Sequence, residues 1–285
     1  MRNEAADRFA NCVVGRTEYD LILRMSLLIF TSFVMPLVAG LATAFLCNNY
    51  VNEGVLSKSS STIAYAVFAG VFFSIISFIM LSMVGRARSH MLRDREWRSS
   101  LVDYASSKGC DVSALNGSDV DVGRYSMSTT RIISLICWIT TLLLLALMLF
   151  SMSVEALRDY PAVIALLVYL MILFQFFFVM GPTIRFAGNH EAMQVEFTRQ
   201  LKSVLASKGI FIESMSPAVP RSHRFIWLAL TIITLGLFHV VLVIYSIYAL
   251  NRHMYNQWAY EEGLLQDIIK AEGATGVEVI PMTKE

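Results

Sequence analysis

Long apolar segments alternate with polar segments along the chain. Five of the apolar runs are about 20 residues long or slightly more, the length that a helix needs to cross the hydrocarbon core of a bilayer. A backbone within lipid must form its hydrogen bonds inside the segment, which favours helices. The pattern predicts an all-α, polytopic integral membrane protein with five hydrophobic helical segments. These runs, which contain no Lys, Asp or Glu, are Met25–Cys47, Thr62–Val84, Ile132–Met152, Ala162–Met180 and Phe225–Leu250.

The overall composition agrees with this prediction and narrows the range of partners. Of the 285 residues, 56% are hydrophobic and 16% are charged, whereas a soluble domain is about half apolar and about a quarter charged. The net charge of +1 offers no strongly basic face, so we expect the lipid bilayer, and not nucleic acid, as a partner. The four cysteines form no C-x-x-C pair, which predicts free thiols. They are Cys12, Cys47, Cys110 and Cys137.

Basic residues are concentrated in the two longer polar segments. Five arginines lie between Arg86 and Arg98, after the second run, and another basic group follows the fourth run. The loops 48–61 and 153–161 hold one basic residue each. Positively charged segments stay in the cytoplasm. The longer segments and the N-terminus are therefore predicted to be cytoplasmic, in a multi-pass protein of the cell membrane.

Two of the polar segments have nearly the same sequence. SHMLRDREWRSSLVDYASSKG, residues 89–109, aligns without a gap with NHEAMQVEFTRQLKSVLASKG, residues 189–209. The alignment pairs His90 with His190, and a third, looser copy begins at His253. A period of about one hundred residues is too long for a short-repeat solenoid and indicates the duplication of a membrane module.

Each copy combines a membrane part with an amphipathic helix, so the duplication predicts tandem repeats of a hairpin plus a cytoplasmic amphipathic helix. The third copy is partial, because one long apolar run replaces the hairpin. The predicted divisions are a cytoplasmic N-terminal segment at 1–20, repeat 1 at 21–126 with its amphipathic helix at 86–108, repeat 2 at 127–223 with its helix at 185–208, and partial repeat 3 at 224–285 with its helix at 253–272.

Apolar residues recur at helical spacing in every copy, which is the pattern of an amphipathic helix. The stripe is expected to pack against other helices or against a partner. It consists of Trp97, Leu101, Phe197, Leu201, Leu205, Trp258 and Leu265. A glycine ends each helix, where a left-handed residue is favoured. The candidate short strands after these glycines are 110–112, 210–212 and 277–280.

The fifth apolar run decides on which side of the membrane the third amphipathic helix lies. The run of about 26 residues is long for one crossing and short for two. A single tilted span is the more common arrangement, and it would place the third helix outside. The alternative is a re-entrant hairpin that breaks near Gly236 and leaves the third helix inside with the other two. Such a break requires protein or water to cover the backbone.

The same part of the chain is similar to a known group of small membrane domains. Residues 224–262, RFIWLALTIITLGLFHVVLVIYSIYALNRHMYNQWAYEE, contain T-L-G-L-F, then an aromatic-rich half and a polar helix. These features resemble the T-L-G-[IF]-[YF] core of the prokaryotic domain of unknown function 4234 group, with Leu237 in place of the usual β-branched residue. The group has no established activity, so the resemblance implies a membrane location and a prokaryotic origin.

Three histidines occupy equivalent positions just beyond membrane runs. His90, His190 and His253 could meet around a metal ion or a headgroup phosphate, but an interfacial histidine more often caps helix carbonyls or faces water. No H-x-x-x-H or E-x-x-H spacing supports a metal site, so neither a metal nor a cofactor is expected. No phosphate-binding loop, nucleophile elbow or dinucleotide fingerprint occurs. We therefore assign no catalytic residue and do not expect an enzyme.

Two polar residues stand inside apolar runs, where a polar group is costly and is a candidate for function. They are Gln175 in the fourth run and His239 in the fifth. A glutamine in this setting commonly forms a hydrogen bond between helices. A transport path would usually add a buried acid or a pair of broken helices, and none of the five runs contains an acidic residue.

The sequence favours a non-catalytic function. Repeated cytoplasmic helices, expected to carry no buried charge, predict a membrane assembly or scaffold subunit that acts as a homo-oligomer or within a membrane complex. The alternative is a small channel or transporter with a path near Gln175 and His239. A third interpretation, a lipid-modifying enzyme that uses the interfacial histidines, lacks a visible pair of nucleophile and base.

Overall fold

The computed structural model describes residues 4–52, 60–116, 127–153, 160–220, 224–234 and 238–273. The all-α prediction is confirmed for these residues, which contain no strand. The candidate strands 110–112 and 210–212 are irregular segments, and 277–280 lies outside the described residues. The elements are α1 (Glu4–Val14), α2 (Arg16–Tyr19), α3 (Met25–Asn52), α4 (Ser60–Ser107), α5 (Ser113–Asn116), α6 (Met127–Ser153), α7 (Tyr160–Gln175), the π-helix η3 (Phe176–Met180), α8 (Gly181–Ala206), α9 (Arg224–Ile233) and α10 (Phe238–Ala271).

The amphipathic helices are continuations of apolar helices and not separate elements. The predicted boundary at 86 falls inside α4, which runs unbroken for 48 residues, about 72 Å at 1.5 Å per residue. Gly85 is the single weak helix former at this point, and one glycine costs only about 1 kcal/mol. The second repeat is also continuous, but a π-helical turn joins α7 to α8. Pro182 follows this turn, and because proline lacks an N–H it disturbs the regular α-helical bonding of the preceding turn.

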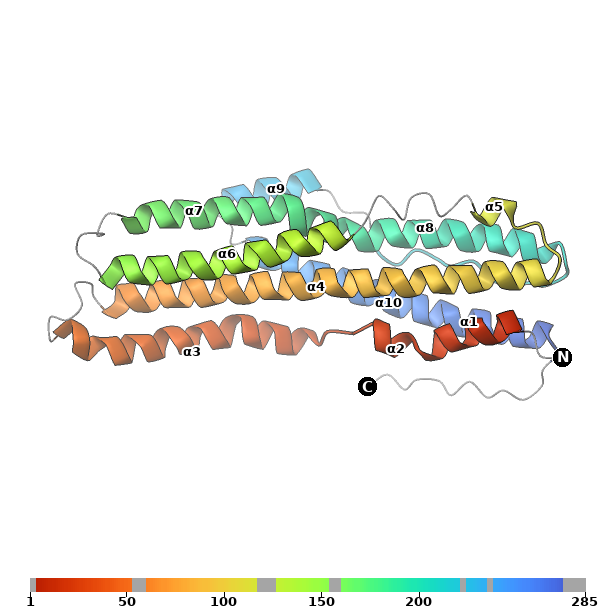
Figure 1. Cartoon of the computed structure of the whole chain (residues 1–285), viewed down its shortest axis with the longest axis horizontal. Helices are drawn as coiled ribbons and strands as arrows, with labels where there is room; N and C mark the ends of the chain where they lie inside the picture. Colours follow the sequence, from red (N-terminus) through yellow and green to blue (C-terminus); the bar gives the residue numbers. More distant parts are fainter. Residues whose placement is uncertain are drawn as a thin grey trace.

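The structure is an elongated stack of helices in which α4, α8 and α10 lie side by side at one end (Figure 1). Two contacts show the relative direction of α4 and α10. His90 contacts His253, and further along both segments Tyr104 donates a hydrogen bond to Glu272 at 3.0 Å. The two helices are therefore parallel. The ring of Trp97 contacts Phe197 of α8 at the same level, so α8 runs in the same direction. We call α1, α8, 86–107 of α4 and 250–271 of α10 the bundle.

Equivalent residues of the three repeats form layers across the bundle. Beginning at each histidine, the layers follow at four, seven, eleven and fifteen residues along each helix, a spacing that keeps them on one helical face. The layers are His90, His190 and His253; Asp94, Gln194 and Gln257; Trp97, Phe197 and Tyr260; Leu101, Leu201 and Leu264; and Ala105, Leu205 and Ile268. The third copy is thus a full structural equivalent of the other two.

Two apolar clusters lie on either side of the polar layers. One fills the bundle and includes Trp97, Phe197 and Leu264. The other lies toward the apolar end of the molecule and includes Met83 and Met180. The two clusters are separated by the polar side chains of the histidine layer and of the Asp94, Gln194 and Gln257 layer that follows it. The core of this protein is therefore interrupted by a buried polar zone.

The apolar run 225–250 forms a helical hairpin. The helix α9 ends at Ile233, α10 begins at Phe238, and the ring of Trp227 in α9 lies 4.5 Å from the ring of Tyr245 in α10. The run is therefore divided into two helices that pack on each other, as the re-entrant alternative expected and an unbroken tilted helix would not be. Gly236, where we expected the break, lies outside the described residues. Thr234 caps this break, because its hydroxyl accepts a hydrogen bond from the backbone N–H of Phe238.

Residues 4–14 of the predicted N-terminal segment 1–20 form a part of the bundle. Phe9 and Val13 of α1 are buried in the same apolar cluster as Trp97. Arg16 donates to a carboxylate oxygen of Glu262 on α10 and to a backbone carbonyl. A single helix among the described residues, Gly70–Ser107, is long and apolar enough to cross a membrane by length and composition, and two shorter apolar helices are Val34–Leu46 and Thr129–Leu144.

We predict that Leu201→Ala destabilises the bundle strongly, because Leu201 is fully buried in the fourth layer. A truncation of this kind leaves a cavity and costs about 2–5 kcal/mol. Thermal unfolding of the purified protein measures the effect. Leu92→Ala is the matched control, because Leu92 is 58% exposed on α4, and it should change stability by less than about 0.5 kcal/mol. Equal losses in both variants would contradict the layer assignment.

Candidate functional site

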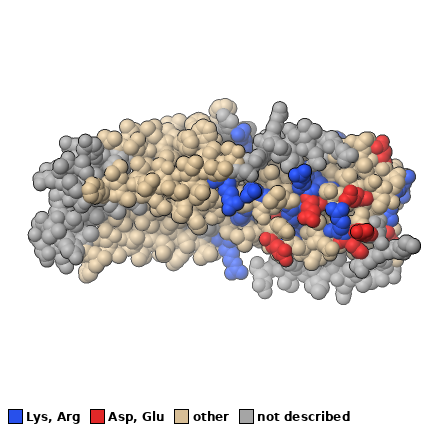
Figure 2. Space-filling view, in the orientation of Figure 1, with Lys and Arg blue, Asp and Glu red and all other residues tan. Residues whose placement is uncertain are grey.

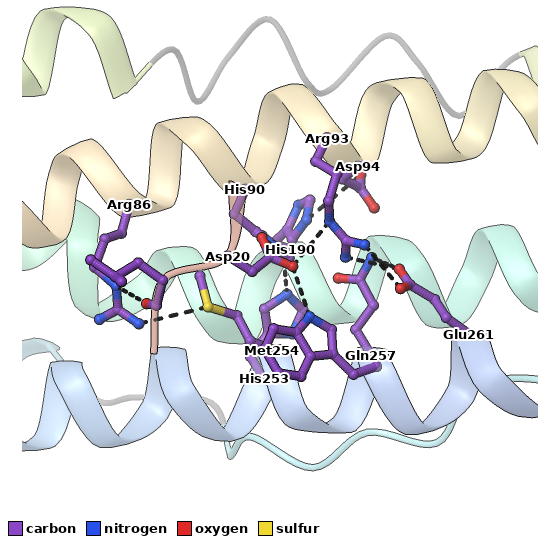
Figure 3. Close-up of polar contacts among 12 residues, drawn as sticks. Asp20, Arg86, His90, Arg93, Asp94, His190, His253, Met254, Gln257 and Glu261 are labelled. Carbon is purple, nitrogen blue, oxygen red and sulfur yellow. Dashed lines mark hydrogen bonds and ion pairs between the residues drawn. The ribbon is translucent and has the colours of Figure 1, made fainter. Parts of the chain in front are cut away.

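The histidine layer brings three imidazoles together from three helices. His90 of α4, His190 of α8 and His253 of α10 are at most 3% exposed, and their ring centroids lie 5.0–5.2 Å apart. Figure 3 shows the three rings directed toward one another. The Nε2 atoms of His90 and His253 are 3.0 Å apart. One ring nitrogen from each histidine lies within 4.8 Å of the others, a spacing that could hold a metal ion.

Each histidine also faces a carboxylate. His90 Nδ1 lies 2.8 Å from Asp20 Oδ1, a direct hydrogen bond. His190 Nε2 lies 3.6 Å from Asp94 Oδ2, and His253 Nδ1 lies 3.7 Å from Glu191 Oε1, both longer than a direct hydrogen bond. A carboxylate that faces the second ring nitrogen fixes the orientation and the tautomer of a histidine. The three rings are therefore oriented from outside as well as packed against one another.

The three carboxylates are themselves held in place. The indole N–H of Trp258 donates to Asp20 Oδ2 at 2.9 Å, which ties the end of α2 to α10. Glu191 Oε2 accepts two backbone N–H bonds, from Ala218 at 2.9 Å and Val219 at 2.7 Å. These bonds fasten the segment after α8 against the bundle. The site therefore depends on two connecting segments in addition to three helices.

A chain of amides and carboxylates forms the next layer. Gln194 Nε2 donates to Asp94 Oδ1 at 2.6 Å and to Gln257 Oε1 at 2.8 Å. Gln257 Nε2 donates in turn to Glu261 Oε1 at 2.7 Å. All four side chains are at most 1% exposed. Buried polar groups stabilise a single arrangement when they are bonded in this way, because an unpaired group in this environment is costly.

Two arginines neutralise part of the buried negative charge. Arg93 binds both oxygens of Glu261, at 2.9 and 2.8 Å, and its Nε lies 3.0 Å from Asp20 Oδ2. Arg98 Nε lies 2.9 Å from Asp94 Oδ2. The planar, two-pronged geometry of a guanidinium suits this kind of bidentate pair. Burial raises the pKa of Glu261, and the contact with Arg93 opposes that rise.

Burial keeps two of the imidazoles neutral. Desolvation lowers the pKa of His190 well below its ordinary value and also lowers the pKa of His253, because the charged form loses its hydration. Burial alone would raise the pKa of Asp94, but nearby groups, His190 and Arg98 first among them, outweigh it and lower the pKa to about 2. Asp94 therefore stays ionised at neutral pH although it is fully buried.

The expectation that the amphipathic helices carry no buried charge is wrong. Asp94 and Glu261 are fully buried, and Arg93 is 2% exposed. The residues that the sequence reasoning missed are Asp20, Arg93, Asp94, Glu191, Gln194, Gln257 and Glu261. The ungapped alignment contained one signal for them, because each histidine is followed four residues later by a carboxylate or an amide. Nothing comparable marked Asp20, which lies outside the repeats.

The predicted stripe residues lie inside the chain and not on a free surface. Trp97, Leu101, Phe197, Leu201, Leu205 and Leu265 all belong to the bundle cluster. Trp258 is 9% exposed and is turned toward Asp20 and Arg16. The aromatic equivalent of Trp97 in the third helix is Tyr260, whose ring lies 6.4 Å away.

Of the two predicted intramembrane contacts, the structure describes the side chain of Gln175 but not that of His239. Gln175 is buried at the end of α7, and its Nε2 donates to Ser77 Oγ of α4 at 2.8 Å. This bond connects the second apolar hairpin to the first, as helix packing requires. His239 lies in the first turn of α10, and its side chain is outside the described part of the chain. The structure does not bring Gln175 into the histidine layer.

The site has no counterpart among the proteins compared with this chain. No protein-family model matches it, and none of the curated proteins or solved structures is significantly similar. The resemblance to the domain of unknown function 4234 group stays a prediction.

We predict that Arg93→Met costs about 3–5 kcal/mol, because it leaves two carboxylates, Asp20 and Glu261, without their buried cation. The double change Arg93→Met with Glu261→Gln should recover part of this loss, because one uncompensated charge is removed. Thermal or chemical unfolding measures both effects.

The control is Arg199→Met, because Arg199 and Glu196 form a pair that is 71% and 46% exposed. Exposed pairs contribute about 0–1 kcal/mol. If Arg199→Met cost as much as Arg93→Met, or if the double variant were less stable than Arg93→Met alone, the assignment of a buried charge network would be wrong.

Proposed function

We propose that the chain is a multi-pass integral membrane protein, non-catalytic, that serves as a membrane assembly or scaffold subunit. The observation that carries the proposal is the separation of charge from exposed apolar surface. On the face shown in Figure 2, the Lys, Arg, Asp and Glu side chains gather over one half of the molecule, and the described part of the other half is uncharged. An apolar surface of this size suits lipid and does not suit water.

Helix length supports several crossings. The helices α3 and α6 contain 28 and 27 residues, and α7 continues through η3 to Met180. Each is long enough for a span of about 20 residues. Large apolar side chains on these helices point outward, including Phe45 at 81% exposed and Leu143 at 65%. We therefore propose four crossings, by α3, the first half of α4, α6 and α7 with η3.

Arginines at the boundary support the cytoplasmic orientation. Arg24, Arg131 and Arg252 are exposed and lie close to the ends of apolar runs, and Figure 2 shows blue side chains gathered where the uncharged half ends. Arginines in this position favour the cytoplasmic side of a membrane. With a re-entrant α9–α10 hairpin, all three parallel helices and the N-terminal segment lie on that side.

The proposed scaffold role follows from what the bundle connects. The helices α4 and α8 continue from the two apolar hairpins, and α10 continues from the re-entrant one. The bundle therefore holds the membrane-embedded parts in a fixed arrangement. Since its apolar stripes are buried within the chain, self-association or binding to a membrane-complex partner would use the lipid-exposed helices.

The proposed topology predicts a simple labelling pattern. In a variant with all four native cysteines changed to serine, Gln266→Cys on α10 should react with a membrane-impermeant maleimide only from the cytoplasmic side, because Gln266 is exposed. Lys58→Cys, in the loop predicted to be outside, should react only from the other side. Labelling of both from one side would exclude the crossings, and Gln266→Cys labelled from outside would exclude the re-entrant hairpin.

The assembly role predicts more than one chain, or a second protein, in each native particle. Mass measurement of the protein extracted directly from the membrane into nanodiscs tests this, because the surrounding lipid keeps contacts between lipid-exposed helices intact. Leu143→Ala with Phe150→Ala should weaken such contacts without unfolding the bundle, since both side chains are more than half exposed. A single chain without a partner in every particle would contradict the assembly role and leave the topology standing.

A further inference from the structure

We propose that His90, His190 and His253 are the ligands of one divalent transition-metal ion of the zinc class, in a buried structural centre. The inference goes beyond the assembly role and does not depend on it. It rests on the convergence of three buried imidazoles within 4.8 Å, on the hydrogen-bonding needs of their nitrogens, and on the carboxylates that surround them.

The nitrogens of His90 and His253 cannot all be satisfied while both imidazoles are neutral. His90 Nδ1 bonds to the Asp20 carboxylate at 2.8 Å and must donate to it, so the Nε2 of a neutral His90 carries a lone pair. His253 Nε2 lies 3.0 Å away and would have to donate into this lone pair. Neutral His253 would then turn a bare Nδ1 toward the Glu191 carboxylate at 3.7 Å, and this buried Nδ1 has no hydrogen-bond partner.

A cation between the two rings resolves this conflict, and a metal ion can use the nitrogens of all three histidines. With a cation between the two Nε2 atoms, both lone pairs become ligands, and the proton of His253 moves to Nδ1, where it faces Glu191. Each ligand histidine then presents its other nitrogen to a carboxylate: Asp20 for His90, Asp94 for His190 and Glu191 for His253. A histidine that binds a metal commonly has such a carboxylate on its second nitrogen.

The distances fit zinc coordination once the third imidazole moves inward. Zn–N bonds of about 2.0–2.1 Å in tetrahedral geometry place two ligand nitrogens about 3.3 Å apart. The observed Nε2–Nε2 distance of 3.0 Å is close to this value. The third nitrogen lies within 4.8 Å and would move inward by about 1.5 Å at most on metal binding. Imidazole ligands suit zinc and the neighbouring first-row metals.

The local charge also favours a dication. The carboxylates around the layer are Asp20, Asp94, Glu191 and Glu261, all at most 2% exposed. The arginines that contact them are Arg93 and Arg98. Arg86 lies one turn earlier in α4 and donates to neutral acceptors, Leu21 O, Asn251 Oδ1 and Met254 Sδ. Together with Arg93 and Arg98, the two charges of a dication would equal the charge of the four carboxylates.

The position of the ion explains why the site is structural. The layer lies where α4, α8 and α10 enter the bundle, between two apolar clusters, and each repeat supplies one ligand. An ion at this point joins the three repeats directly. The ligands are at most 3% exposed, so the ion would be enclosed by the chain, with the fourth position of its tetrahedron taken by water or another small ligand.

The experiment uses the full-length protein purified in detergent, first as isolated and then after dialysis against a chelator. We expect about one equivalent of zinc per chain in the first sample by elemental analysis. Adding Zn²⁺ to the second should raise its melting temperature, because an ion that binds the folded state stabilises it. Adding Co²⁺ instead should give the visible absorption of a tetrahedral site, and X-ray absorption on the zinc form should detect three imidazole ligands.

Variants locate the ion. His253→Gln should lose the metal and the rise in melting temperature, whereas His223→Gln, which changes a histidine that is not one of the three proposed ligands, should retain both. Asp20→Asn and Glu191→Gln keep all three ligands and should weaken zinc affinity about 10–100-fold, as expected for residues that orient a ligand. These two variants keep the test informative if His253→Gln does not fold.

The proposal is overturned by either of two results. One is a folded wild-type protein that holds no metal as isolated and shows no thermal shift or Co²⁺ spectrum. The other is unchanged zinc content and affinity in folded His253→Gln or in both orienting variants, which would place the metal elsewhere on the chain.

Discussion

The constraint on which the rest of this structure depends is that charged groups buried away from water must find partners. Asp94 and Glu261 are fully buried, where an unpaired carboxylate would be very costly. Their partners come from other turns and other helices: Arg93 of α4 binds Glu261 of α10, and Gln194 of α8 binds Asp94 of α4. The polar zone can therefore form only when the three helices are present together and in one alignment.

This constraint sets the register of the bundle more sharply than apolar packing does. Leucines and isoleucines recur along α4, α8 and α10 at spacings that a shift of one heptad would largely preserve, and cores tolerate such exchanges of apolar groups. The same shift would move Glu261 away from Arg93 and leave both buried without a partner. A few polar residues in an otherwise apolar bundle can fix alignment in this way. Asp20 extends the effect to the N-terminal segment through Trp258 and Arg93.

The sequence predicted those features that depend on local pattern. Helices, apolar runs and the repeat are periodic signals, and the glycines expected to end the helices do so with positive φ: 68° at Gly109, 75° at Gly209 and 68° at Gly273. The division of the fifth apolar run into α9 and α10 was less predictable, because about 26 apolar residues satisfy the length requirement of one tilted span. The Asp20 contacts were not predictable, because they join residues 70 and 238 positions apart.

The divergence of the three repeats at the layer below the histidines has an electrostatic reason. This position holds Asp94 in the first copy but Gln194 and Gln257 in the others. Three aspartates here would bring three negative charges into one buried layer, where their repulsion would be strong. Two glutamines instead carry hydrogen bonds from Asp94 to Glu261 without adding charge. The carboxylates that face the other two histidines come from different positions, Asp20 and Glu191. Because of this distribution the three helices are no longer interchangeable, and each has one place in the bundle.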